Sequence, residues 1–285
     1  MNPQSHLKMT ALPLLFILSS AIAPAAVLSY ESFSGYTDAT QLDNQTAPTV
    51  AGYVGNWVHG NTSFGTQDIL TSSTGLTYAG LTTTGGSAGV PTNTAGGEIV
   101  AGNSGRNARA LDSSITVDAT TTGTLYMSFL FQTGRETGAA TYQMLELYNG
   151  INTIDTNGDA TRAFQAGTSG NGNNYTFGVG NSASAVSLGA ANTAVHQFLV
   201  RFNLSATAGA DSATIWLDPT TETGGISTSG LNLAWNALSL ADYDGNSAKW
   251  DEIRWGTTFA DVVPEPSAAL LGGLGFLGLL RRRRA

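Results

Sequence analysis

The chain has 285 residues, with 20 acidic and 12 basic side chains and a formal net charge of −8 at pH 7. It has no cysteine, which excludes disulfides, thiolate metal sites and cysteine nucleophiles. Only 11% of the residues are charged, but 41% are hydrophobic, which is enough for a folded core. Five of the basic residues, Lys8 and four arginines, lie near the two ends of the chain, so the remainder is strongly acidic. Such a region lacks the basic surface that binds nucleic acid.

The first 25 residues have the pattern of a secretory signal peptide. Lys8 precedes an apolar run over residues 11–22, and the small residues Ala23, Pro24 and Ala25 follow it directly. This order predicts recognition by the Sec export machinery and cleavage after Ala25. An uncleaved membrane anchor is the alternative, but the apolar run is short and ends at the small residues. We therefore expect residues 26–262 to fold outside the inner membrane.

Residues 26–262 contain short segments in which apolar and polar side chains alternate. The clearest are 125–132 (LYMSFLFQ), 196–204 (HQFLVRFNL) and 212–219 (SATIWLDP), with further segments at 142–148 and 174–180. Such alternation places every second side chain on the same face of a strand. The side chains expected on core-facing sides are Leu125, Met127, Phe129 and Phe131; Phe198, Val200, Phe202 and Leu204; and Ala213, Ile215 and Leu217.

Turn-forming residues separate these segments, for example at 156–159, 168–174 and 207–212. No part of residues 26–262 shows a sustained helical stripe of apolar side chains. Many short strands with polar turns predict a single all-β domain, which we interpret as an antiparallel β-sandwich.

The segment SATIWLDP after a strand, and WDEIRWGTTFADV at 250–262, resemble laminin-G-like or concanavalin A-like jelly rolls. That resemblance implies that the first strand pairs beside the last, so that LSYESF (28–33) lies next to DEIRWGT (251–257). A Greek-key sandwich of another family would show the same alternation.

No catalytic residues are predicted. Glucanases of concanavalin A-like fold need two carboxylates across a cleft, usually in a Glu-x-Asp-x-x-Glu strand, and the sequence has no such segment. Asp251 and Glu252 are adjacent, so we expect them on opposite faces of a strand, and Glu146 lies between leucines that face the core. The sequence has no nucleophile-elbow motif that could form a catalytic triad with His59 or His196, and we expect both histidines at strand ends.

Calcium is the metal that the sequence favours, and no other cofactor is predicted. Two loops carry oxygen-bearing side chains at alternate positions, which is an arrangement that suits a hard cation. Asp, Asn and Gly also form turns without any metal, and that is the interpretation we prefer for both loops. The residues are Asp155, Asn157 and Asp159 in the first loop, and Asp242, Asp244 and Asn246 in the second.

Carbohydrate binding is the remaining functional hypothesis for the domain. Sugars stack on exposed aromatic rings, and Trp57, Tyr175, Trp235 and Trp250 are the candidates. Core packing is the alternative role for each of these side chains.

The last segment, 263–285, joins an apolar run at 267–280 to four terminal arginines. As a helix the run is only about 21 Å long, shorter than a bilayer core of roughly 30 Å. The arginines nevertheless favour a transmembrane helix, because they suit the cytoplasmic rim of a bilayer and their long stems can reach it. Pro264 and Pro266 keep the preceding residues extended, as a processing enzyme requires.

This tail resembles the PEP-CTERM sorting signal of exported bacterial proteins. The resemblance implies recognition by an exosortase, with Pro264, Glu265 and Pro266 as the recognition motif. It implies a stop signal formed by Arg281, Arg282, Arg283 and Arg284. A plain C-terminal anchor with a proline-containing stalk is the alternative.

The sequence therefore predicts an exported protein in three parts: a signal peptide (1–25), a β-sandwich (26–262) and a sorting signal (263–285). We expect transient anchoring in the inner membrane with the sandwich in the periplasm, followed by transfer to the cell surface or matrix. A non-catalytic role that includes polysaccharide binding is favoured. A diverged glycan-active jelly-roll enzyme, either a glycoside hydrolase or a lyase, is the alternative.

Overall fold

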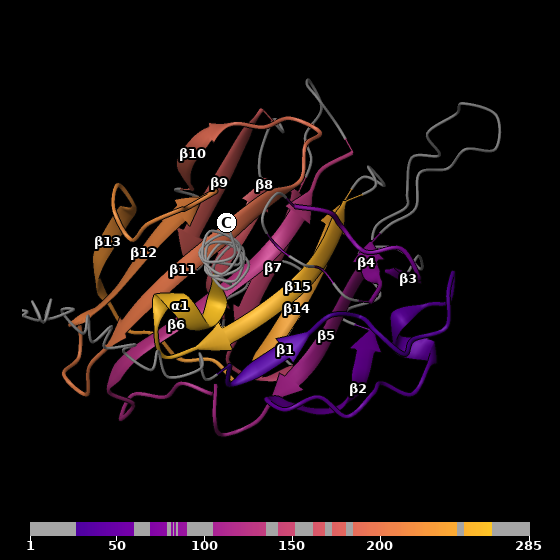
Figure 1. Cartoon of the computed structure of the whole chain (residues 1–285). Helices are drawn as coiled ribbons and strands as arrows, with labels where there is room; N and C mark the ends of the chain where they lie inside the picture. Colours follow the sequence, from indigo (N-terminus) through magenta and orange to yellow (C-terminus); the bar gives the residue numbers. More distant parts are fainter. Residues whose placement is uncertain are drawn as a thin grey trace, which may run out of the picture.

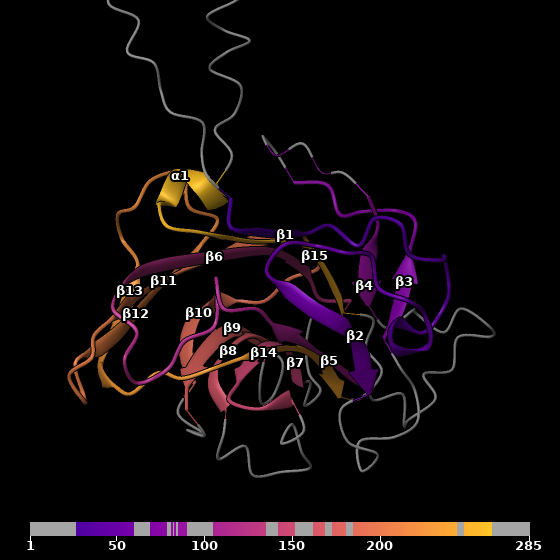
Figure 2. The same ribbon diagram turned by 90° about the horizontal axis from the view of Figure 1, so that it is seen from below.

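The computed structural model describes residues 27–59, 69–78, 81, 83, 85–89, 105–134, 142–151, 162–168, 173–180, 185–243 and 248–263. These residues form two antiparallel sheets that pack face to face as a jelly-roll β-sandwich (Figures 1 and 2). The all-β prediction is therefore confirmed. The predicted signal peptide and the apolar run at 267–280 lie outside the described residues, so the two terminal helices stay predictions.

The first sheet has eight strands in the order β13-β12-β11-β6-β15-β4-β3, and β1 also pairs with β15. Its members are β1 (Ser29–Glu31), β3 (Leu70–Ser72), β4 (Ser87–Gly89), β6 (Gly123–Gln132), β11 (His196–Leu204), β12 (Asp211–Leu217), β13 (Ile226–Leu231) and β15 (Lys249–Gly256).

The second sheet has seven strands in the order β10-β9-β8-β7-β14-β5-β2. Its members are β2 (Tyr53–His59), β5 (Gly105–Leu111), β7 (Tyr142–Tyr148), β8 (Arg162–Thr168), β9 (Asn174–Val179), β10 (Val186–Ala190) and β14 (Ala237–Tyr243). The described helical turns are a 3-10 turn at Leu42–Asn44 and α1 at Phe259–Val262, which lies on the outer face of the eight-stranded sheet (Figure 2).

The core forms where the alternating faces of the two sheets meet. All the core-facing side chains predicted on β6 and β11 belong to one continuous apolar cluster between the sheets, as do Ala213 and Ile215, with Leu217 packed at its margin. Phe129 and Phe198 stand opposite each other on paired strands and their rings stack with centroids 5.1 Å apart. Because a strand has a side-chain period of two, its alternation in sequence was enough to identify the buried face.

The first and last strands of the sandwich are neighbours, as the resemblance implied. Ser29 of β1 pairs with Trp255 of β15, and Glu31 pairs with Ile253. Since β15 leads directly into α1, the beginning and the end of the described sandwich lie on the same side of the molecule (Figure 2).

A buried ion pair joins the two sheets beneath β1. Arg109 on β5 donates through Nη1 to Glu31 Oε2 at 2.8 Å, and both side chains are almost completely buried. The same guanidinium donates to the carbonyls of Gly55 and Pro48 at 2.9 and 2.8 Å. Burial raises the pKa of Glu31, although Arg109 and the hydrogen bond from the Phe33 N–H oppose the shift. The pair is satisfied only while both partners are present.

Replacing Arg109 with Met should lower the free energy of unfolding by about 3–5 kcal/mol, because Glu31 would lose its partner inside the sandwich. Urea unfolding measures this loss. Arg201→Met is the matched control: it breaks a pair with Glu222 whose side chains are 30% and 34% exposed, so the expected loss is about 1 kcal/mol or less. Equal, small losses for the two variants would contradict the prediction.

Candidate functional site

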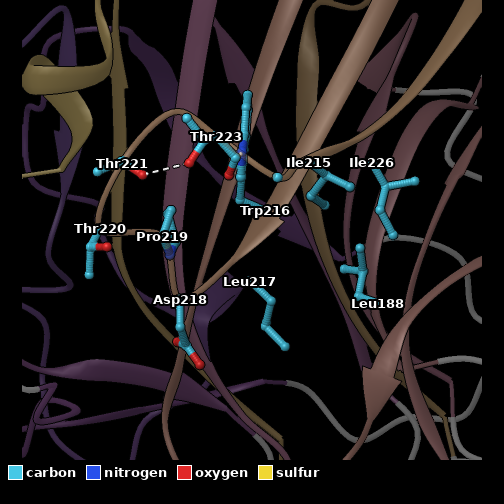
Figure 3. Close-up of a pocket in the computed structure, with 11 residues that line it drawn as sticks. Leu188, Ile215, Trp216, Leu217, Asp218, Pro219, Thr220, Thr221, Thr223 and Ile226 are labelled. Carbon is cyan, nitrogen blue, oxygen red and sulfur yellow. Dashed lines mark hydrogen bonds between the residues drawn. The ribbon is translucent and has the colours of Figure 1, made fainter.

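An open pocket of about 360 Å³ lies at the side of the sandwich where β10 and β13 are the outermost strands of their sheets (Figure 3). Its apolar side is formed by strands of both sheets, and its polar side by the loop that follows β12. The lining residues are Leu188, Ile215, Trp216, Leu217, Asp218, Pro219, Thr220, Thr221, Thr223, Gly224 and Ile226. The lining thus combines three threonines and one carboxylate with apolar side chains.

The polar loop is shaped by its own residues. Asp218 has a φ of 51° and Gly224 a φ of 74°, so the chain reverses through two left-handed positions between β12 and β13. The Trp216 indole N–H donates to the carbonyl of Thr223 at 3.0 Å, and the hydroxyls of Thr221 and Thr223 lie 2.8 Å apart (Figure 3). These contacts hold the threonines along the rim of the pocket.

Asp218 connects this loop to two other parts of the chain, Tyr78 and the start of β11. Its Oδ1 accepts hydrogen bonds from the Tyr78 hydroxyl and the Gln197 N–H, both at 2.9 Å. Its Oδ2 lies 2.5 Å from His196 Nδ1. Partial burial raises the pKa of Asp218, but the hydrogen bonds from His196, Gln197 and Tyr78 outweigh it and the net pKa is lowered. Asp218 is therefore anionic at neutral pH while its side chain stays 36% exposed.

His196 completes a pair that sequence reasoning missed. Its Nε2 lies 3.0 Å from Asn192 Oδ1, and that oxygen also accepts the Ala194 N–H at 2.8 Å. Both ring nitrogens thus face acceptors, and neither is placed to remove a proton from a hydroxyl. His196 does begin β11, and His59 ends β2, so the predicted strand-end positions are confirmed.

The aromatic side chains considered for sugar stacking do not form a surface. Trp57, Tyr175, Trp235 and Trp250 are all buried and all belong to the main core. The binding hypothesis is wrong for these residues, and the alternative of core packing holds. The physical reason is that each lies on the inward face of its strand or connection, where a large ring contributes most to the hydrophobic core.

Asp251 and Glu252 lie on the same face of β15, so the expectation of opposite faces is wrong. The register with β6 shifts between Asp251 and Arg254, and Glu252 has a φ of 53°, which marks a β-bulge. Glu252 accepts from the Tyr30 hydroxyl at 2.6 Å and pairs with Arg254, while Asp251 accepts the Leu76 and Glu252 N–H groups at 2.8 and 2.7 Å. Both carboxyl groups are buried and serve internal contacts.

Glu146 belongs to a second buried polar cluster, on the outer face of the seven-stranded sheet. Its flanking leucines point into the core, as predicted, and its Oε1 lies 3.2 Å from Arg106 and 3.0 Å from Arg162. The Tyr142 hydroxyl donates to the same oxygen. Because Glu146 is fully buried and held by two arginines, it forms a structural ion-pair network.

Of the six residues considered for calcium, only Asp242 is among the described residues. Asp242 lies in β14, where its Oδ2 accepts the Ala248 N–H at 3.2 Å and its Oδ1 accepts from Gln143 at 3.5 Å. Asp155, Asn157, Asp159, Asp244 and Asn246 lie outside the described residues. Within the described part of the chain, no three metal-binding side chains come together.

The residues of the predicted sorting signal, Pro264, Glu265, Pro266 and the terminal arginines, also lie outside the described residues. In the described ranges, no helix has the length and apolar character needed to cross a membrane. The junction with the signal is described up to Val263, directly after α1.

Comparison with known families decides the nature of this tail. Residues 262–284 match the PEP-CTERM protein-sorting motif. The match confirms the resemblance drawn from the proline triplet, the apolar run and the arginines. A PEP-CTERM motif indicates an exported protein that is anchored through its C-terminus and processed by an exosortase. Among curated protein sequences, none matches the chain.

Several solved structures are similar to the fold. The T. cruzi calreticulin globular domain has a TM-score of 0.49 and 10% identity, over 72% of this chain and 85% of that one. A carbohydrate esterase from Shiga toxin-encoding bacteriophage phi24B has a TM-score of 0.43 and 13% identity, over 70% of this chain and 88% of that one. The binding domain of botulinum neurotoxin serotype G has a TM-score of 0.44 and 10% identity, over 89% of this chain and 51% of that one. Because these scores are low, the fold is assigned from the sheet topology itself.

Stability should fall as pH rises because of Asp251. Burial and the neighbouring Glu252 raise its pKa from 3.8 to about 8, against the backbone hydrogen bonds that lower it. The folded state therefore holds a proton that the unfolded chain has lost, and stability declines between about pH 4 and pH 8. Asp251→Asn should make the slope of the unfolding free energy shallower, by at most about 1.4 kcal/mol per pH unit.

Urea unfolding at several pH values checks this slope. Asp118→Asn is the control, because Asp118 is exposed and hydrogen bonds from Thr120 and Thr121 lower its pKa. That control should leave the slope above about pH 5 as it is in the wild type. A wild-type stability that does not depend on pH in this interval would contradict the prediction for Asp251.

Proposed function

We propose that the protein is an exosortase-sorted component of the cell surface or extracellular matrix, and that its sandwich binds polysaccharide without catalysis. The PEP-CTERM match at 262–284 supports the sorting half of this proposal. The edge pocket with its threonine and aspartate rim supports the binding half.

The chemistry of the pocket suits a sugar. Leu188, Leu217 and Ile226 offer apolar contacts to the C–H groups of a sugar ring. Thr220 and Thr223 add hydroxyls on the rim, and the Asp218 carboxylate can accept from sugar hydroxyls. A volume of about 360 Å³ is at the lower end of the range for ligand pockets, enough for one or two sugar units of a longer chain.

The same pocket argues against glycoside hydrolysis. Hydrolysis of a glycosidic bond needs two carboxyl groups roughly 5–10 Å apart across the substrate. Among the pocket-lining residues in the described ranges, Asp218 is the single acid. His196 could activate a nucleophile only through a free ring nitrogen, and both of its nitrogens already face acceptors. We therefore favour binding over the enzyme alternative.

The double variant Thr220→Val/Thr223→Val should weaken polysaccharide binding about tenfold, because it removes two hydroxyls worth about 0.5–1.5 kcal/mol each while valine is close to threonine in size. A glycan array with and without calcium identifies the oligosaccharide to use, and calorimetric titration then measures its affinity. Thr207→Val is the matched control, since this exposed threonine lies in the turn at the other end of β12. Equal affinities for the double variant and the wild type would refute the pocket assignment.

Replacing Pro264, Glu265 and Pro266 together with alanine should abolish processing, because the alanine chain lacks the extended recognition motif. The size and location of the chain in cells that carry the exosortase report the result. The Thr220→Val/Thr223→Val variant is the control and should be processed like the wild type. If the alanine variant is still processed and released, the sorting half of the proposal fails.

A further inference from the structure

The PEP-CTERM match begins inside the folded sandwich. Its first residue, Val262, is the last residue of α1 and is completely buried. Val262 packs on the outer face of the eight-stranded sheet in a small apolar cluster, and Phe259 and Val263 add to this cluster at its margin. The other buried members are Tyr126, Leu199 and Trp216. The sandwich therefore meets the motif without a spacer between them.

Polar contacts fasten the same turn to the sheet. The Ser128 hydroxyl on β6 donates to the Val262 carbonyl at 2.6 Å. Asp261, which is buried, accepts the N–H groups of Thr257 and Thr258 through Oδ2 at 2.8 and 2.7 Å. These bonds cap the first turn of α1 and hold its backbone in place.

The docked conformation conflicts with processing. An enzyme that binds a peptide in a cleft takes it as an extended strand, whose main-chain groups bond to the enzyme. In the sandwich, the Val263 N–H donates to the Phe259 carbonyl at 3.0 Å, and the Val262 carbonyl is occupied by Ser128. Pro264 follows Val263 directly. Val263 already has extended dihedrals, with φ −114° and ψ 92°, but Val262 cannot stay in the docked helical turn of α1 and lie extended in a cleft at once.

We propose that release of α1 from the eight-stranded sheet controls the rate at which the sorting motif is processed, with Asp261 and Ser128 as the side chains that set this rate. The inference rests on the exosortase sorting proposed above. In this proposal, α1 determines when the sorting motif becomes accessible to the processing enzyme. The enzyme itself would contact the extended residues only after the turn has left the sheet.

A pulse-chase measurement on the full chain, in cells that carry the exosortase, tests this proposal. Asp261→Ala removes the two N–H contacts that cap α1 and should speed conversion to the processed form about fivefold, which converts to about 1 kcal/mol. Asp211→Ala is the matched control: Asp211 is also buried and accepts two backbone N–H groups, from Ser205 and Leu233, far from the junction. Faster processing of Asp211→Ala as well would indicate general unfolding and would overturn the proposal.

A spacer makes the test independent of protein stability. Insertion of Gly-Ser-Gly-Ser-Gly-Ser between Val263 and Pro264 supplies about 20 Å of extended chain while α1 stays docked. The spaced chain should be processed faster than the wild type, and Asp261→Ala should then have no further effect.

If Asp261→Ala leaves the rate unchanged while the alanine triplet variant blocks processing, α1 does not control the step but sorting stands. If the alanine triplet variant is processed normally, the sorting proposal itself has failed.

Discussion

The structure depends on burying one apolar face of each sheet against the other. The chain has no cysteine, so packing must hold the sandwich together without covalent help. Most of its large rings are therefore needed in the core, where Phe129, Phe131, Phe198 and Tyr175 contact one another. This requirement explains why the aromatic residues that looked available for sugars are all internal. It also leaves the polar chemistry to the outer faces and the edges of the sheets.

Strand β15 joins the beginning, the core and the end of the described sandwich. It pairs with β6 in the middle of the sheet, holds β1 on its other side and leads into α1. Its bulge turns both Asp251 and Glu252 outward, while Trp250, Ile253 and Trp255 remain in the core. One strand thus couples the N-terminal end of the sandwich, the core and the residue at which the PEP-CTERM motif begins.

The buried charges show two ways of placing an ion in this fold. Arg109 and Glu31 lie between the sheets and are satisfied by each other and by carbonyl and N–H groups of the surrounding loops. Glu146 with Arg106 and Arg162 lies on an outer face instead. Asp218 differs from both because it is partly exposed and borders a pocket. Its exposure and its place in the pocket lining are why we propose Asp218, and not Glu31 or Glu146, for ligand binding.

The sequence by itself determined the fold class, the bounds of β7 and β11, the core face of β6 and the sorting motif. Strand alternation and a linear motif are local signals that need no knowledge of distant residues. It did not reveal β8 or β13, because RAFQAGT and ISTSGL are rich in small and polar residues and show no clear alternation. Only the tertiary structure brought Asp218 to His196 across the β11–β12 pairing, turned Glu252 outward at a bulge, and placed Val262 on the outer face of the eight-stranded sheet. Each of these contacts joins residues whose proximity depends on strand register and packing, which the local pattern does not encode.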